Sequence, residues 1–296
     1  MHIPAVLRCN ARAAWGSDGE RWLADLPGLL ADLARDWDLD VGKPFELSFN
    51  WVTAATRADG TPAVLKLGPP TAGHLQAEAF ALDAFDGHGA VRVLDRDDER
   101  GALLLERALP GTRARGDDEA VADVMCRLHR DPPPGCPLPA LATLRTAFVA
   151  HLDRFPGDGP LPRRWVDRAN QMFLDLDSSA ERTVVLHGDL HHDNVLAATR
   201  EPWLAIDPAG LIGDPGFDAG AMLYNPEPAV HNEALLQLVP ARVELIADRL
   251  GLPIERVRAW GFVMAVLSEV WTADGGEDVG GRPMDVAQLL EQSLDD

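Results

Sequence analysis

The chain has 296 residues, 46% of them hydrophobic and 25% charged, which is ordinary for a globular protein of one large domain or two lobes. Its formal net charge is −20 and it has no run of basic residues, which argues against binding to DNA or RNA. No apolar run reaches the roughly 18–20 residues of a membrane span, and the apolar stretch within residues 1–10 is too short for a secretory signal. We therefore expect a cytoplasmic protein that is not attached to a membrane.

Three cysteines are spread along the chain, and no CxxC pair is present. An odd number of widely separated cysteines supports neither a disulfide framework nor a structural zinc site. We therefore interpret Cys9, Cys126 and Cys136 as reduced thiols.

Residues 1–107 are expected to form a strand-rich lobe. Apolar residues recur at near-helical spacing from Glu20 to Leu39 and predict a helix there. Beyond it, apolar and polar residues alternate on either side of a turn signal at Asp59-Gly60, which predicts antiparallel strands. The predicted strands are Phe45–Thr53, Ala63–Leu67, Ala90–Leu94 and Ala102–Glu106, with a helix at His74–Phe85 between the second and the third.

Residues 108–296 are expected to form a mainly helical lobe. The stretch Arg107–Gly111 interrupts the strand pattern with proline and glycine, and it places the predicted boundary after residue 107. Helices are predicted at Val121–His129, Arg145–Phe155, Trp165–Leu176, Phe217–Tyr224, Val230–Leu250, Ile254–Trp271 and near the C-terminus, and short strands at Thr183–Leu186 and Trp203–Ile206. Strands followed by helices are the order of an α+β protein.

Three polar residues beside the two short strands fit the needs of phosphoryl transfer. Asp189 and Asn194 follow the first strand, five residues apart, and Asp207 ends the second. If the two strands pair as a hairpin, the three side chains meet at one end of it. Asn194 and Asp207 then offer oxygen ligands that suit Mg²⁺, and Asp189 can orient the acceptor hydroxyl.

The motifs around these residues are similar to those of a known family. The run Leu186–Asn194, followed by Ile206–Pro208, resembles the catalytic and metal-binding loops of the aminoglycoside phosphotransferases. With Gly210–Pro215 further on, it looks like the streptomycin 6-kinase and hydroxyurea phosphotransferase branch. The resemblance implies a protein-kinase-like, two-lobed fold, in which residues 1–107 bind nucleotide and residues 108–296 carry catalysis and substrate binding.

The same resemblance implies how the first lobe holds a nucleotide. Lys66 would pair with the nucleotide phosphates and with Glu78 on the following helix. Backbone groups of Glu106 and Ala108 would meet the adenine. The implied cofactors are ATP, with GTP as an alternative, and Mg²⁺.

The resemblance also implies a support for the catalytic loop and shows two departures. His187 would pack beneath the loop, and Asp218 would either bond to loop amides or only cap a helix. The segment Leu47–Val52 lacks the glycines that cradle phosphates in protein kinases. Ala209 stands where the streptomycin-kinase branch has lysine.

Acidic residues near the C-terminus are the candidates for substrate binding. Carboxylates recognise guanidinium and ammonium groups, and a negatively charged protein attracts cations. We therefore expect contacts to a cationic acceptor, the alternative being a solvated acidic loop. The candidate residues are Glu269, Asp274, Glu277 and Asp278.

Together these features predict a phosphotransferase that modifies a hydroxyl of a streptomycin-type aminoglycoside, an antibiotic-resistance kinase acting as a monomer. Kinases of hydroxyurea or of another small metabolite are alternatives. A metal-dependent hydrolase is a more distant one, because His187, Asp189, His191, His192 and Asp193 are close in sequence. A relative that binds substrate but has lost catalysis is the third.

Overall fold

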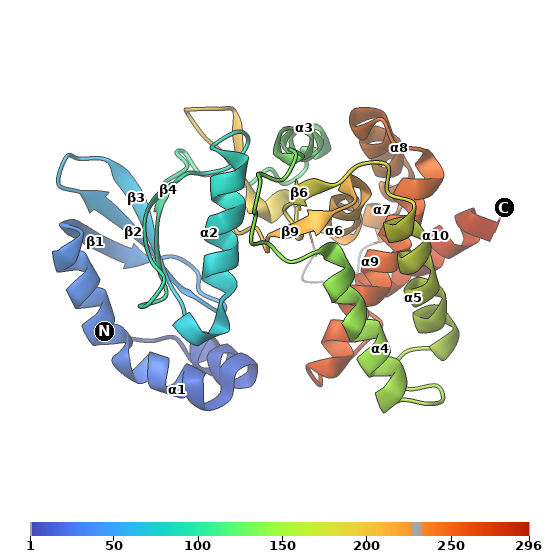
Figure 1. Ribbon diagram of the computed structural model, residues 1–296, viewed down its shortest axis with the longest axis horizontal. Coiled ribbons are helices and arrows are strands. Elements are labelled where there is room, and N and C mark those ends of the chain that lie inside the picture. The colour runs from blue at the N-terminus through green and yellow to red at the C-terminus, as the bar shows by residue number, and fades with distance from the viewer. Residues whose placement is uncertain (1, 227–232, 296) are drawn as a thin grey trace.

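The computed structural model describes residues 2–226 and 233–295, with an antiparallel sheet at one end and a group of helices at the other (Figure 1). The strands follow the order β1-β2-β3-β5-β4 across the sheet. Their bounds are β1 Leu39–Pro44, β2 Trp51–Arg57, β3 Pro62–Leu67, β4 Val93–Asp97 and β5 Ala102–Glu106. The predicted α+β class is confirmed.

Strand β3 separates two cores through the alternation of its side chains. Leu65 and Leu67 are fully buried on one face, in a cluster with helix α1 (Ala5–Asp36). Lys66 faces the other way, toward helix α2 (His74–Phe85), which stands between the sheet and the helical part in Figure 1. One strand therefore both anchors α1 and presents a lysine to the interior of the molecule.

Two predictions for this part were wrong in their bounds. Residues 45–50 are a loop between β1 and β2, because Pro44 lies at a break in the register and its ring nitrogen cannot donate to the ladder. Strand β4 begins three residues later than predicted, since Ala90 and Val91 pair instead with Ala205 of the helical part.

Helix α1 begins fifteen residues before the predicted start and bends at Gly16, whose backbone is not helical. Its first half has a weak apolar period, and tertiary contacts, among them those of the fully buried Leu7 and Ala11, hold it in place.

The rest of the described chain is mainly helical. The helices are α3 Asp118–Leu128, α4 Arg145–Arg154, α5 Arg163–Ser178, α6 Ala219–Tyr224, α7 Glu233–Leu236, α8 Val239–Leu250, α9 Ile254–Asp274 and α10 Arg282–Asp295. The first residues of the predicted helix Val230–Leu250 lie outside the described residues. Its described part is two helices, and Pro240 stands in the first turn of the second, where proline is favoured.

Helix α9 forms the centre of this part. Its Trp260 is fully buried, and the rings of Phe173 and Phe217 meet it edge-on at centroid distances of 5.4 and 5.6 Å. Edge-to-face aromatic pairs of this kind add about 0.5–1.5 kcal/mol each to the burial of their area. The N-terminal half of α9 is therefore fixed by an aromatic core.

Four short strands form two separate pairs. Strand β6 (Val184–Leu186) pairs with β9 (Leu211–Gly213), and β7 (Val195–Ala197) pairs with β8 (Trp203–Ala205). The predicted hairpin between β6 and β8 is therefore wrong. Strand β7, which was not predicted, takes the place of β6 because only a short turn separates it from β8.

Within residues 2–226 and 233–295, no helix combines the length and the apolar character of a membrane span. The three cysteines are free; Cys9 is exposed, and Cys126 and Cys136 are partly exposed.

Candidate active site

A buried ion cluster connects the sheet with the helical part. Lys66 Nζ lies 2.6 Å from Glu78 Oε2 and 2.6 Å from Asp207 Oδ1. Burial alone would lower the pKa of the Lys66 ammonium, but the carboxylates of Asp207 and Glu78 outweigh it and raise the pKa above its ordinary value. The ammonium therefore stays charged at all physiological pH values.

Asp207 leaves the regular backbone conformation directly after β8. Its φ is 58°, in the left-handed region that costs a non-glycine residue about 1–3 kcal/mol. The Lys66 side chain is 5% exposed, whereas that of Asp207 is 49% exposed, so the cluster is open on the Asp207 side. Strain of this kind is concentrated at functional sites.

The β7–β8 hairpin places Asn194 beside Asp207. Asn194 directly precedes β7, and its carbonyl oxygen accepts a hydrogen bond of 2.9 Å from the amide of Ile206. Its side-chain Nδ2 donates to the carbonyl oxygen of Asp189 at 2.9 Å. The three residues that the sequence singled out thus lie together, although the hairpin that joins them is not the predicted one.

Asp189 is the carboxylate of this group that faces the open cleft. Burial, followed by the negative charges of Asp207 and Asp218, raises the pKa of Asp189 to about 7, against a smaller lowering by Asn194. Such a carboxylate is a better proton acceptor than an ordinary aspartate.

Asp218 supports the turn that carries Asp189. Its buried carboxylate accepts hydrogen bonds from the amides of His187 at 3.0 Å and Gly188 at 2.7 Å, and its Oδ2 lies 3.0 Å from His129 Nε2. Burial would raise its pKa, but His129 and these contacts outweigh burial and lower the pKa below its ordinary value. His187, fully buried, donates from Nε2 to the carbonyl oxygen of Ile206 at 2.9 Å and so ties the turn to β8.

The segment after β5 is the predicted contact for adenine. The amide of Glu106 already donates to the carbonyl oxygen of Arg92 at 2.8 Å, and its carboxylate makes two bonds of 2.8 and 2.9 Å to Arg200. The nearby Ala108 is buried. The adenine contact remains a prediction. The hydrogen bonds of Glu106 fix the position of this segment.

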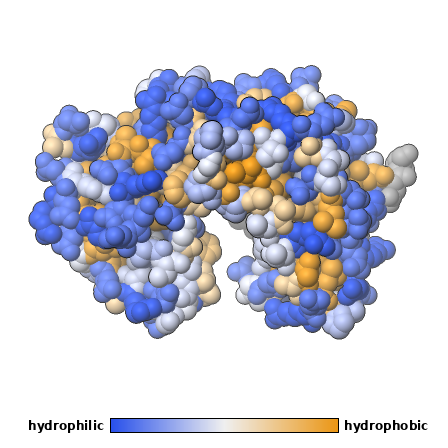
Figure 2. All heavy atoms as spheres, in the orientation of Figure 1, coloured by the Kyte–Doolittle hydropathy of each residue, from blue (hydrophilic) through white to orange (hydrophobic). Residues whose placement is uncertain are grey.

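A cleft of about 680 Å³ opens beside Asp189, where Figure 2 shows the molecule hollowed between its two ends. Residues of α9 and of the loop after it form one wall. Among them are three of the four predicted substrate residues, Glu269, Glu277 and Asp278. A cleft of this size suits a drug-sized molecule.

The fourth predicted residue, Asp274, does not line this cleft. Its Oδ1 lies 3.6 Å from His151 Nδ1 and 3.7 Å from Arg154 Nη1, both on α4. Asp274 is therefore paired with basic residues of the protein itself, because α4 packs against the end of α9. Glu269 is also partly engaged, accepting a hydrogen bond of 2.8 Å from the amide of Gly280.

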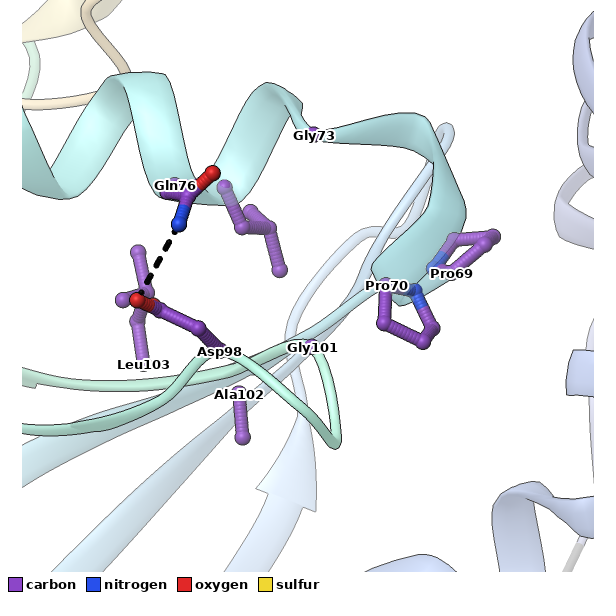
Figure 3. A pocket seen from close by; sticks show the side chains of 9 residues that line it. Pro69, Pro70, Gly73, Gln76, Asp98, Gly101, Ala102 and Leu103 are labelled. Carbon is purple, nitrogen blue, oxygen red and sulfur yellow. Dashed lines mark hydrogen bonds between the residues drawn. The ribbon is translucent and has the colours of Figure 1, made fainter. Parts of the chain in front are cut away.

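A second cavity lies behind α2, between its first turns and the β4–β5 turn (Figure 3). There Gln76 donates to Asp98 at 3.2 Å across the mouth. Its volume of about 40 Å³ has room for little more than one or two waters. This cavity cannot hold a nucleotide or a drug-sized acceptor.

Two sets of ion pairs hold the catalytic loop against neighbouring elements. The sequence did not predict either of them. Arg115 binds Asp193 through two bonds of 2.5 and 2.8 Å. Asp118 accepts from His192 at 2.6 Å and lies 3.0 Å from Arg242. Their partners are 74 or more residues apart along the chain, so no local pattern could have revealed them.

His187 and His192 are thus occupied as structural hydrogen-bonding groups, whereas His191 accepts from the amide of Asp193 at 3.2 Å and lines the cleft. In the described part of the chain, no group of three or more His, Cys, Asp or Glu residues is arranged to hold a metal ion.

Solved structures show the same fold. The choline kinase LicA from Streptococcus pneumoniae matches 90% of this chain and 96% of its own with a TM-score of 0.62 at 14% identity. The aminoglycoside phosphotransferase APH(4)-Ia, solved as a ternary complex with ADP and hygromycin B, matches 90% and 96% with a TM-score of 0.59 at 14% identity. These structures show that the chain has a protein-kinase-like fold.

Sequence comparisons narrow this class to a family. Streptomycin 6-kinase of Streptomyces glaucescens is 33% identical over 98% of this chain and 97% of its own. Hydroxyurea phosphotransferase of Kitasatospora aureofaciens is 34% identical over 98% and 86%. The model of the aminoglycoside/hydroxyurea antibiotic resistance kinases matches residues 40–276. The chain belongs to this family.

Proposed function

We propose that the protein transfers the terminal phosphate of ATP, or of GTP, to a hydroxyl of a streptomycin-type aminoglycoside. The observation that carries the proposal is the position of Asp189, between the Lys66–Asp207 cluster and the acidic cleft. Streptomycin 6-kinase of Streptomyces griseus, 35% identical over 93% of this chain, supports the choice of acceptor.

Lys66 is the residue proposed to hold the nucleotide phosphates. The carboxylate of Glu78 stabilises the positive charge of Lys66, and Asp207 lies on the more exposed side of the ammonium group. A phosphate arriving there would compete for the ammonium with Asp207, and a cation beside Asp207 would relieve that competition.

The chain fits a Mg²⁺ ion at this point. Asp207 offers a half-exposed carboxylate, and Asn194 turns its Nδ2 to Asp189, so that its side-chain oxygen remains as a neutral ligand. When bound, Mg²⁺ would neutralise phosphate charge that Lys66 alone cannot balance.

Asp189 is proposed to orient the acceptor hydroxyl and to take up its proton. The turn that carries it is fixed by Asp218 and His187, so its carboxylate is held in position before the acceptor arrives. A fixed carboxylate saves the entropy of orienting the hydroxyl at the moment of transfer.

The size and charge of the cleft favour an aminoglycoside over hydroxyurea as acceptor. A cleft of about 680 Å³ is far larger than a molecule of hydroxyurea's size requires. Glu277 and Asp278 on its wall are suited to the cationic groups of an aminoglycoside. The hydroxyurea phosphotransferase relative keeps the smaller acceptor as the second candidate.

The test is a phosphorylation assay with ATP and with GTP, in the presence of Mg²⁺, on streptomycin, other aminoglycosides, hydroxyurea and simple amino alcohols. We expect phosphate transfer to streptomycin, observed by mass spectrometry of the product. Phosphorylation of hydroxyurea but not of streptomycin would favour the second candidate. Nucleotide-independent hydrolysis of phosphate esters, or tight acceptor binding without transfer, would contradict the proposal.

A further inference from the structure

The loop 45–50, between β1 and β2, occupies the place at which protein kinases carry their glycine-rich phosphate loop, and it contains no glycine. A loop without glycine cannot bring its backbone amides close to phosphate in the same way. A contact to the phosphates from this side would therefore come from a side chain.

Asn50, the last residue of the loop, lies at the end of the sheet from which a side chain could contact the phosphates. Its neighbours Trp51 and Val52 pair with Leu67 and Lys66, so Asn50 stands beside Gly68, just past the lysine. A Cβ on Gly68 would approach Asn50 Oδ1 to 2.6 Å. The absence of a side chain at Gly68 therefore leaves room for the Asn50 amide in this position.

His74 fixes the orientation of the Asn50 side chain. Its Nε2 lies 2.7 Å from Asn50 Oδ1, and since that oxygen can only accept, Nε2–H is the donor. His74 also lies one helical turn before Glu78, on the face of α2 that meets Lys66. Burial and the nearby Lys66 ammonium lower the pKa of His74 to about 4, so the ring is neutral and keeps this single-donor arrangement.

Residues of helix α1 support the Asn50–His74 pair. The ring of Trp15 stacks on His74 at a centroid distance of 5.3 Å and 12° between planes, and it meets Phe49 edge-on at 6.3 Å. Asn10 Nδ2 donates to the carbonyl oxygen of Ser48 at 3.1 Å. Three consecutive loop residues, 48–50, are thus tied to α1 or to a residue that α1 supports.

With Oδ1 engaged by His74, the two N–H groups of Asn50 Nδ2 are left without a hydrogen-bond partner within the described ranges. They belong to a half-buried side chain close to the Lys66–Asp207 cluster. A neutral amide donor in that place can bind a phosphate oxygen without adding a second charge beside Lys66.

We propose that Asn50 binds the β- or γ-phosphate of the nucleotide through its side-chain amide, and that His74, stacked on Trp15, is the positioning residue that orients it. This side-chain device replaces the glycine-rich loop. The inference rests on the proposed kinase function, because it names how the same site distinguishes a nucleoside triphosphate from a monophosphate.

Isothermal titration of the full chain with ATP and with AMP, each with Mg²⁺, tests the inference. Asn50→Ala should weaken ATP binding by about tenfold or more while AMP binding changes by less than about twofold. Asn50→Asp should weaken ATP binding further, because a carboxylate repels phosphate. Gln76→Ala is the matched control: it removes another amide, two residues beyond His74, that bonds to Asp98 away from the site, and it should change neither affinity (Figure 3).

His74 is tested by its ATP-to-AMP affinity ratio. His74→Phe keeps a ring for Trp15 to stack on but loses the N–H donor, and it should lower the ratio as Asn50→Ala does. His74→Gln keeps a donor and should restore most of it. ATP binding by Asn50→Ala equal to that of the parent, or an equal loss of ATP and AMP binding, would overturn the inference alone. A parent protein that binds no ATP would overturn the proposed function together with it.

Discussion

At the scale of the residue, Asp189 and Asp207 differ in their partners. Asp207 is bound by Lys66, whereas Asp189 keeps its carboxylate toward the acceptor cleft and is fixed through its backbone by Asn194. In the proposed function, these two aspartates therefore have separate roles, Asp207 on the nucleotide side and Asp189 on the acceptor side.

Asp189→Asn should lower kcat by about 10²- to 10⁴-fold, because it removes the group that orients the hydroxyl and accepts its proton. Nucleotide affinity should stay within about threefold, since the Lys66 cluster is untouched. Steady-state kinetics and ATP titration measure the two effects. Asp153→Asn, at an exposed position of α4, is the control, and near-normal turnover in the Asp189 variant would refute the role.

Asp207→Ala should abolish the dependence of ATP affinity on Mg²⁺, because it removes the only charged ligand proposed for the ion. The measurement is ATP titration with Mg²⁺ and with a chelator, in the parent and in the variant. A parent protein whose ATP affinity is the same in both conditions would count against the assignment.

At the scale of the element, short segments of the C-terminal part deliver the site residues from fixed positions. The turn after β6 is held by Asp218 at the start of α6, and the loop after α9 is held by Glu269 through Gly280. Both supports are buried carboxylates that accept backbone N–H groups, which rigidifies a loop more than an exposed contact would.

Asp218→Asn should lower the free energy of unfolding by about 1–3 kcal/mol at neutral pH, since it weakens the bonds to two loop amides and to His129. The pKa of Asp218 is lower in the folded protein than its ordinary value of about 3.9. The parent protein therefore has this extra stability in full at pH values above about 3.9, and it loses the stability as the pH falls through the lower pKa of the folded state. Urea unfolding of both proteins at pH 7 and below pH 4 should show the difference shrinking in acid. A pH-independent difference would contradict this account.

The loop after α9 is predicted to recognise the cationic acceptor. Glu277→Gln combined with Asp278→Asn should raise KM for streptomycin by about tenfold with little change in kcat, because the carboxylates bind the ground state and the transition state alike. Asp274→Asn is the control, since Asp274 faces α4 instead of the cleft. An unchanged KM in the double variant would leave these acids as a solvated loop.

At the scale of the whole molecule, the net charge of −20 creates a field that attracts cations. Salt screens such a field, with a Debye length of about 10 Å at 0.1 M. The kcat/KM for streptomycin should therefore fall several-fold as ionic strength rises from about 20 to 200 mM. A neutral acceptor should show little change, and equal salt sensitivity for both kinds of acceptor would show that steering plays no part.

Sequence patterns predicted helices and strands correctly where the pattern lies within one short segment of the chain. Helix α2 occupies the predicted residues His74–Phe85, and β3 and β5 lie where alternation placed them. The spacing of Asp189, Asn194 and Asp207 also predicted a phosphotransferase, the class of enzyme to which the relatives belong, because the loops that hold such groups are short and nearly contiguous. Patterns failed at the first half of α1 and at residues 45–50, whose conformations depend on partners far along the chain.

The motifs of the sequence were enough to predict the family and the class of reaction, which the relatives confirm, and to name the residues proposed to surround the transferred phosphate. Tertiary contacts set which strand Asn194 precedes and which acids line the cleft, and they underlie the proposal for the loop that lacks glycine. The physical reason is the same in each case. Contacts between separate segments of the chain decide each of them: β6 with β9, Asp274 with α4, and Asn50 with His74 and Trp15. Only the packing of one segment on another brings these groups together.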